Sequence, residues 1–361
     1  MADQKTIAVW RGKEAEWGPV KVWANTLSNQ SVTLLIGNLS INNPQVAIFA
    51  GVLFFCVITC CVAGDAVFSK DGERIYAIAS TEPDPALKEI DLATKTIRTI
   101  ALKQLAANDW PSGITCTNDD RILCTTMGSL WSFDPRSENL TKIRDAPSGA
   151  RFRGVAFDPK IHGTFVTTDD PEGPLFMFRK ENEWIPVRMR RHPYPSCLVF
   201  TASGELFFAA YGDLWYGEIQ TDTFDGEDHF SVAAYRYAPL ATLETENSTP
   251  SEIGVADIGV SREAIYVQLS RMGGSGDGWF ARLARPVPKR TNEQSLDLLY
   301  KPNERLPLYQ KSLSSLKILG EDFHAGQIAV SPDERRVYYV MHGKHWLVTN
   351  GKTEELHLTQ K

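Results

Sequence analysis

The stretch FSKDGERIYAI at residues 68–78 and its counterpart VSPDERRVYYV at residues 330–340 decide the fold of this 361-residue chain. In both, an apolar residue leads into a polar turn that carries a serine and an aspartate. A run rich in β-branched and aromatic residues follows the turn. Because serine and aspartate side chains stabilise tight turns and such runs favour strands, each stretch predicts a β-hairpin.

The same pattern recurs between these two stretches. It returns as CTNDDRILC (116–124), FDPKIHGTFV (157–166), FTASGELFFA (200–209) and VSREAIYV (260–267). The second strands of the hairpins, taken at Ile75, Ile122, Thr164, Leu206, Ile265 and Val337, are 47, 42, 42, 59 and 72 residues apart. The first three spacings are typical of a four-stranded propeller blade, and the last two predict insertions.

Two further strands are expected after each hairpin. They are residues 87–92 with 96–102, 130–133 with 140–143, 175–178 with 184–187, 214–219 with 230–237, 279–283 with 296–299, and 345–348 with 356–358. With no helical period after Asp65, the sequence predicts an all-β fold, a β-propeller of six four-stranded blades. Seven blades is the alternative, with expected strands at 5–11, 21–26 and 31–38 as the seventh, and residues 300–325 offer an additional edge strand.

The repeats resemble those of a known superfamily. The first unit, with Ser69, Asp71 and Gly72 before Ile75 and Tyr76, is similar to the YVTN-type propeller repeat. The last unit, with Ser331-Pro-Asp333 before 337–340, is similar to that repeat and to the TolB-type repeat. The resemblance covers residues 66–358 at the level of repeat pattern. It implies a propeller and leaves function open, because such propellers serve as scaffolds, sensors and lactonases.

An uncharged apolar run lies before the repeats. Residues 46–64 read VAIFAGVLFFCVITCCVAG, and the chain has no charged residue between Val22 and Gly64. This length favours one membrane-spanning helix or signal anchor, and a pair of buried strands is the alternative. We therefore expect a polar N-terminal tail at 1–45, the hydrophobic segment at 46–64 and the propeller at 65–361. Lysines and arginines before the run favour a membrane-anchored or exported protein whose propeller is extracytoplasmic, periplasmic or extracellular.

Composition and motifs argue against several kinds of partner and site. The net charge of −6 argues against a nucleic-acid partner. Cys116, Cys124 and Cys197 are the cysteines outside the apolar run, and their spacing predicts neither a disulfide framework nor a metal site. The glycine-rich stretch 273–278 lacks the spacing of a nucleophile elbow, and the acidic stretch 222–228 lacks the order of an EF-hand loop. The sequence thus predicts no catalytic residue, no metal site and no cofactor.

The candidate binding site follows from the expected fold. Ligands of propellers meet the mouth of the central channel, where the chain enters each innermost strand. The residues expected there mix aromatic rings with cations and one carboxylate, and they are Trp110, Arg151, Arg153, Tyr194, Glu252 and His324. Such a mixture is common in binding pockets, and the two arginines favour an anionic partner.

Three functions remain open from the sequence. The first is a non-enzymatic, membrane-tethered or exported scaffold that binds a protein or a small anionic ligand. The second is a propeller hydrolase or lactonase with a metal-assisted site at the channel mouth, for which Glu252 and His324 are the candidate residues. The third is a propeller that only spaces the membrane from other components. We leave open whether the protein is an enzyme, and favour the scaffold.

Overall fold

The structure is a computed structural model that describes part of the chain. The described residues are 4–11, 16–25, 33–36, 65–79, 82–107, 109–147, 149–169, 175–178, 184–189, 195, 197–210, 213–224, 227–238, 253–271, 278–285, 316–321 and 326–361. Within them every regular element is a β-strand, and no helix is long and apolar enough to cross a membrane. The apolar run at 46–64 lies outside the described residues. The chain divides into two compact units, Met1–Val57 and Ile58–Lys361.

The first unit contains the three strands predicted near the N-terminus. They are β1 (Gln4–Arg11), β2 (Glu16–Asn25) and β3 (Thr33–Ile36), and they form an antiparallel sheet of their own in the order β1-β2-β3. Trp10 lies opposite Trp17 in the register of the first pair.

The second unit repeats one pattern of four antiparallel strands. The first repeat is β4 (Ala66–Phe68), β5 (Arg74–Ile78), β6 (Ala86–Asp91) and β7 (Thr96–Ala101). The second is β8 (Gly113–Cys116), β9 (Ile122–Thr125), β10 (Ser129–Asp134) and β11 (Asn139–Asp145). The last two are β20 (Ile253–Val260), β21 (Ala264–Arg271), β22 (Gly278–Ala284) and β23 (Lys317–Glu321), then β24 (Gly326–Val330), β25 (Arg336–Met341), β26 (Lys344–Thr349) and β27 (Lys352–Leu356).

Two of the repeats between these merge into one sheet. They are β12 (Phe152–Asp158), β13 (Gly163–Thr168), β14 (Leu175–Phe178) and β15 (Trp184–Met189), then β16 (Cys197–Phe200), β17 (Leu206–Ala210), β18 (Asp213–Phe224) and β19 (Glu227–Ala238). The outermost strands β15 and β19 pair in parallel, which gives an eight-stranded sheet. At the end of the chain, β28 (Thr359–Gln360) pairs in parallel with β7 as a fifth strand of the first sheet.

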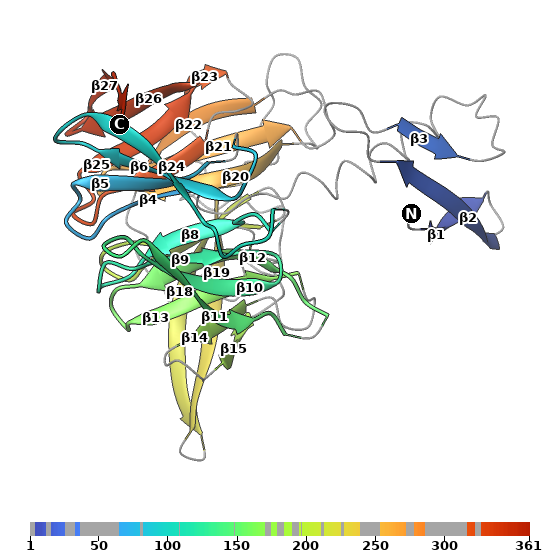
Figure 1. Ribbon diagram of the computed structural model, residues 1–361. Coiled ribbons are helices and arrows are strands. Elements are labelled where there is room, and N and C mark those ends of the chain that lie inside the picture. Colours follow the sequence, from blue (N-terminus) through green and yellow to red (C-terminus); the bar gives the residue numbers. More distant parts are fainter. Residues whose placement is uncertain are drawn as a thin grey trace. The chain divides into compact units, whose positions relative to one another are not determined.

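The first strands of the repeats form a closed ring. Each contacts the first strand of the next repeat, from β4 through β8, β12, β16, β20 and β24, and β24 contacts β4 again. The sheets fan outward from these strands (Figure 1). This is the propeller-like arrangement that the sequence predicts, and a cavity lies on the axis of the ring.

Apolar cores between neighbouring sheets hold the ring together. Tyr76 and Leu87 of the first repeat pack with Phe133 of the second, and comparable clusters join each later pair of sheets. The last cluster brings Tyr338 of β25 against Ile75 of β5 and so links the last repeat to the first. Because both faces of each sheet meet a neighbour, the sheets bury apolar side chains on both faces.

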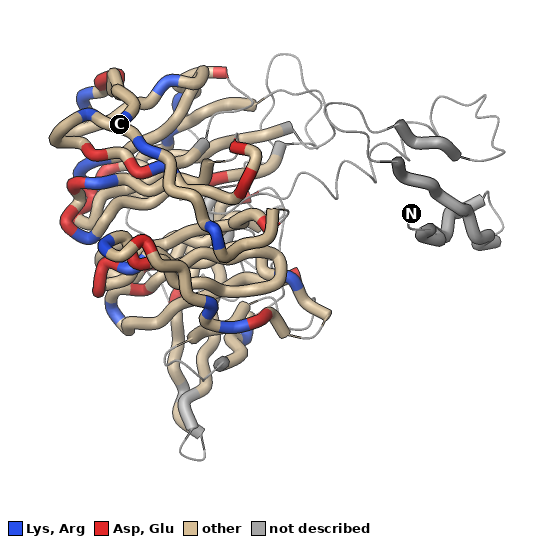
Figure 2. Tube along the Cα trace, in the orientation of Figure 1, with Lys and Arg blue, Asp and Glu red and all other residues tan. Residues whose placement is uncertain are grey.

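Charged residues avoid the centre of the ring. Lys, Arg, Asp and Glu lie mainly on the turns and outer strands (Figure 2). The first strands carry Arg153, Asp158 and Asp257 as their charged residues.

Several strand boundaries differ from the sequence prediction. The fourth strand of the fifth repeat is β23 at Lys317–Glu321, within the stretch expected to hold an additional edge strand, whereas the predicted strand 296–299 lies outside the described residues. β27 ends at Leu356, where the predicted strand begins, because Asn350 and Gly351 make a tight turn with positive φ and the chain pairs again at once. Among the described residues, Cys116, Cys124 and Cys197 take part in no disulfide.

Candidate functional site

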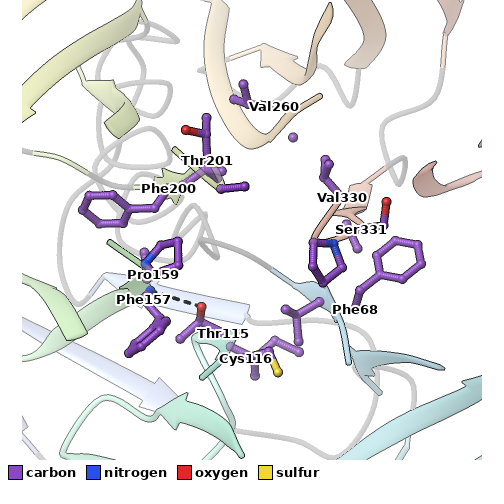
Figure 3. A pocket seen from close by; sticks show the side chains of 18 of the residues that line it. Phe68, Thr115, Cys116, Phe157, Pro159, Phe200, Thr201, Val260, Val330 and Ser331 are labelled. Atoms are coloured by element: carbon purple, nitrogen blue, oxygen red, sulfur yellow. Dashed lines mark hydrogen bonds between the residues drawn. The ribbon is translucent and has the colours of Figure 1, made fainter. Parts of the chain in front are cut away.

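A cavity of about 240 Å³ lies on the axis of the ring. Residues of all the first strands line it, as do residues of the turns after β4, β8, β12, β16 and β24. The lining side chains are largely apolar and include Val67, Ile114, Val155, Leu198, Ile258, Val260, Ile328 and Val330. Figure 3 shows these strands arranged around an opening, with the rings of Phe68, Phe157 and Phe200 directed away from it, into the contacts between sheets. We call the end of the channel formed by the turns after the first strands the turn mouth, and the opposite end the N-terminal mouth.

The predicted polar turns build the turn mouth. In the first hairpin the Ser69 hydroxyl donates to Asp71 Oδ1 at 2.6 Å and accepts the Arg74 N–H at 2.9 Å. Ser331 makes the same two contacts with Asp333 and Arg336. Thr117 and Thr201 hold the equivalent positions of two other hairpins. The recurring serine or threonine is therefore a turn-forming residue and not a nucleophile.

Contacts between turns surround the turn mouth. The Lys70 N–H donates to Asp120 Oδ1 at 3.0 Å, and the Lys70 ammonium donates to the Asn118 carbonyl. The Asn118 side chain is 2.7 Å from Nδ1 of His162 on the next turn. These contacts join the first three repeats.

A partly buried ion cluster joins the other repeats. The Arg285 guanidinium, 9% exposed, pairs with Glu205 and also with Glu334, the latter at 3.1 Å. Glu334 lines the cavity and accepts the Ala202 N–H at 2.7 Å through its other oxygen. The turn after β20 is short, and Glu334 spans it to reach the turn after β16. The cluster thus fixes the geometry of the mouth and neutralises the carboxylate that lines it.

Cys116 does not offer a nucleophile at this mouth. Burial, together with the negative charge of Asp120, raises the pKa of its thiol to about 12. The thiol therefore stays protonated at neutral pH, and only a thiolate attacks readily.

Two carboxyl groups lie near the other end of the cavity. Asp65 and Asp257 each come one residue before a residue that lines the cavity, Ala66 and Ile258. Asp257 is 3% exposed, accepts the N–H groups of Ile258 and Ile328 at 2.8 Å, and accepts the Cys197 thiol at 3.8 Å. It therefore bridges β16, β20 and β24. The Ile328 N–H is free for this contact because β24 departs from regular pairing between Gly326 and Ala329.

Asp65 is held in an unusual environment for a carboxyl group. Its Oδ1 is fully shielded from solvent and has no hydrogen-bond partner among the described residues. Burial raises the pKa of Asp65 well above its ordinary value, and the neighbouring charge of Asp257 raises it further. A carboxyl group of this kind holds its proton at a higher pH than an exposed one, which is a property of acid and base catalysts and of proton-sharing pairs.

Aligning the first strands by their last residues places Asp65 and Asp257 on one level with Cys197 and Gln327. At the same level, β8 carries Gly113 and β12 carries Val155. The Gln327 side chain donates to the Ile78 carbonyl at 2.8 Å, so it is directed to β5. Sequence reasoning did not select Asp65 or Asp257. The available signal was a single carboxylate within the otherwise uncharged stretch 253–260.

Three of the six predicted site residues are described. Trp110 is half-buried and lies before β8. The exposed Arg151 donates its backbone N–H to Asp169 at 2.6 Å, and the Arg153 guanidinium is 3.6 Å from the same carboxylate. Arg151 and Arg153 thus lie together at the N-terminal end of β12, with Asp169 offsetting part of their charge. Tyr194, Glu252 and His324 lie outside the described residues.

The described residues bring no three histidine, cysteine, aspartate or glutamate side chains together as metal ligands. Within that part of the chain, Asp65 and Asp257 are the residues on the axis that most resemble a catalytic site.

Similarity to known proteins is found at the level of structure. No protein-family model matches this chain, and no curated protein matches it. Among solved structures the chain is similar to regucalcin, a calcium-binding protein from Agrobacterium tumefaciens, at 14% identity over 82% of this chain and 94% of that chain, with a TM-score of 0.49. It is also similar to the WD40 repeats of RRP9 (8% identity, 76% and 85% covered, TM-score 0.44) and to oligogalacturonate lyase from Vibrio parahaemolyticus (9% identity, 80% and 76% covered, TM-score 0.39). These neighbours are propeller-type proteins, and the assignment of this chain to that class rests on its own ring of first strands.

Proposed function

We propose that this chain is a six-bladed β-propeller of the YVTN or TolB type that acts as a non-enzymatic binding scaffold. The observation that carries the proposal is the ring of first strands, which closes from β24 back to β4 around a cavity of about 240 Å³. Concave axial cavities of this kind are where propellers and other closed β-folds bind ligands. Residues 46–64 tether the protein to a membrane or direct its export, with the propeller on the extracytoplasmic side, periplasmic or extracellular.

The partner at the N-terminal mouth is a protein segment or a small ligand that carries negative charge. Arg151 and Arg153 project from the start of one first strand, and Arg151 is exposed. A second carboxylate brought to this pair would compete with Asp169 for charge-assisted hydrogen bonds.

Titration of the purified full chain with an acidic peptide of alternating Asp and Gly residues tests this function. We expect saturable binding that weakens about tenfold in the Arg151→Ala, Arg153→Ala double variant, because two charge-assisted contacts are lost. The matched control is Arg136→Ala, an exposed arginine on the turn between β10 and β11. Equal binding by all three proteins would contradict the proposal.

A second candidate function is a propeller hydrolase or lactonase, favoured by the buried carboxyl pair. Asp65 has the raised pKa of a general acid, and Asp257 lies close enough to raise it. In this alternative a metal ion at the channel mouth, held through Glu252 and His324, supplies an activated water. Lactone hydrolysis that is lost in Asp257→Asn, together with a stoichiometric divalent metal lost in Glu252→Ala, would establish the enzyme and overturn the scaffold.

A further inference from the structure

The turn mouth of the cavity has a chemistry different from that of the N-terminal mouth. The charged side chains that line it are Lys70 and Glu334, and both are engaged within the protein. The Lys70 ammonium donates to the Asn118 carbonyl, while Glu334 accepts from Arg285 and from the Ala202 N–H. An uncharged ligand leaves both of these contacts intact, whereas a cationic ligand would have to displace Arg285 from Glu334 to be neutralised.

The hydroxyl groups at the mouth are also engaged. Thr201 and Ser331 bond within their own turns, and Thr115 Oγ1 accepts the Phe157 N–H at 3.2 Å (Figure 3). The second strand of each sheet pairs with one edge of the first strand, and the other edge faces the ring axis. Backbone N–H and C=O groups on that inner edge are therefore the hydrogen-bonding groups that the cavity offers a ligand.

The remaining wall is apolar and sets the size of the occupant. Val260, Val330 and the prolines at 159 and 332 line the opening. A cavity of about 150 Å³ with apolar walls is enough to hold benzene, so 240 Å³ accommodates a fused two-ring system. Proline faces pack well against flat aromatic rings in recognition grooves.

We propose that the turn mouth binds an uncharged heteroaromatic ring of about the size of indole. Its ring atoms contact the apolar wall, and its N–H bonds to a backbone carbonyl on the inner edge of a first strand. The ring belongs either to a free small molecule or to a tryptophan side chain of a partner. This inference rests on the proposed binding function and names the ligand of the second mouth.

The probe is 5-fluoroindole, followed by ¹⁹F NMR with the full chain. Three related compounds define the chemistry: fluorobenzene lacks the N–H, 5-fluoroindole-2-carboxylate adds a charge, and N-acetyl-tryptophanamide presents the ring on a peptide. We expect 5-fluoroindole to bind at least about tenfold more tightly than the first two, since each leaves a polar group or a charge unmatched. If N-acetyl-tryptophanamide displaces the probe, the natural ligand is a tryptophan side chain of a partner. If it does not displace the probe, the natural ligand is a free small molecule.

The matched variants are Ala202→Phe and Ala107→Phe. Both positions are exposed turn residues, but Ala202 lines the cavity and Ala107 does not. A phenyl group at 202 obstructs the opening, so we expect binding about tenfold weaker in that variant and within about twofold of wild type in the control. Pro332→Phe obstructs the same opening and replaces Ala202→Phe if that variant does not fold.

Equal binding of 5-fluoroindole by the Ala202 and Ala107 variants would overturn the inference, as would tighter binding of the carboxylate. The arginine pair at the N-terminal mouth is untouched in these variants. Binding of the acidic peptide therefore reports separately on the proposed function.

Discussion

Ser69 shows how single residues of the repeat act. Its side chain is 2% exposed and serves both the Arg74 N–H and the Asp71 carboxylate, so it supports the turn that lies at the cavity mouth. The hydrogen bond from Ser69 is the main reason that the pKa of Asp71 lies below its ordinary value. The equivalent pair, Ser331 and Asp333, shows the same lowered pKa for the same reason.

Ser69→Ala should lower the free energy of unfolding by about 1 kcal/mol, because the Arg74 N–H loses its acceptor. The ionised Asp71 side chain stabilises the folded state above the pKa of aspartate in the unfolded chain, and this stabilisation is lost as the pH falls through the lower pKa of the folded state. The difference in free energy of unfolding between wild type and variant should therefore shrink below about pH 3.8. Urea denaturation at pH 7 and pH 3 measures both effects. The exposed Ser137, which donates to Asp134, is the control, and Ser137→Ala should cost less than about 0.5 kcal/mol. Equal losses for the two variants would contradict this account.

Asp65 makes the opposite contribution to stability. The pKa of Asp65 is raised in the folded state. Its protonated form therefore stabilises the fold below about pH 4, and this stabilisation is lost as the pH rises through the pKa of the folded state. Asp65→Asn imitates the protonated form. We expect its free energy of unfolding to match that of wild type at pH 3.5 and to exceed it at pH 7.5, because the amide carries no charge for burial to disfavour. Denaturant unfolding at the two pH values checks this, and a variant less stable than wild type at pH 7.5 would disprove it.

The sequence pattern predicted the turn residues and missed the axial carboxyls. Ser69, Asp71, Ser331 and Asp333 form a local motif, so their spacing alone indicates the contacts. Asp65 and Asp257 are far apart in sequence and meet through the ring closure. The strand of Asp257 also has an irregular pairing between Val255 and Asp257, which no propensity predicts.

Neighbouring first strands approach each other closely, and Gly259 shows how closely. A Cβ at this position would lie 2.3 Å from Cγ2 of Ile328 and 3.1 Å from Cγ2 of Val330 on the next first strand. A glycine in the middle of β20 is thus required by the packing of β24 against it.

Gly259→Ala should destabilise the protein by about 2 kcal/mol, the usual cost of forcing one extra carbon into a packed core. Gly128→Ala is the control, since a Cβ there meets no atom within 4 Å. Thermal and urea denaturation should therefore give a free energy of unfolding about 2 kcal/mol lower for Gly259→Ala than for Gly128→Ala. A Gly259→Ala protein as stable as the control would show that β20 and β24 are not packed as described.

The Arg285 cluster links elements of three repeats, and its removal is informative. Arg285→Met keeps the aliphatic stem but leaves Glu205 and Glu334 without their cation. We expect a loss of about 3 kcal/mol, typical of breaking a buried ion pair. Arg121→Met, whose partner Asp119 is exposed, should cost less than about 1 kcal/mol. Equal costs in urea denaturation would mean that the cluster does not hold the turns together.

At the level of elements, the first and last repeats were predictable and the middle ones less so. Short hairpins such as β4–β5 and β24–β25 follow the turn chemistry of the sequence. The 12-residue strands β18 and β19 and the parallel pairing of β19 with β15 depend on contacts between repeats, so local pattern gives no signal for them. β23 lies within the stretch 300–325 that was expected to hold an additional edge strand. Its place as the fourth strand of the fifth repeat was not predicted, because a long insertion separates it from β22.

For the whole second unit, closure of the ring is the property on which both binding proposals depend. The repeat spacing predicted an axial channel, and the contact of β24 with β4 provides it. The chemistry of the two mouths did not follow from the sequence, because each mouth is assembled from turns and strand ends of many repeats. Arg151 and Arg153 were identified from their place at the start of a strand, whereas the contacts of Lys70 with Asn118 and of Glu334 with Arg285 required the structure.

A crystal structure of the full chain with 5-bromoindole tests the central claim most directly, since the anomalous signal of bromine locates the ring. The account predicts a bromine peak on the axis of a closed ring of sheets, within contact distance of Val260, Val330 and Pro332. A peak outside the channel, or sheets that form an open sandwich without an axial cavity, would contradict it.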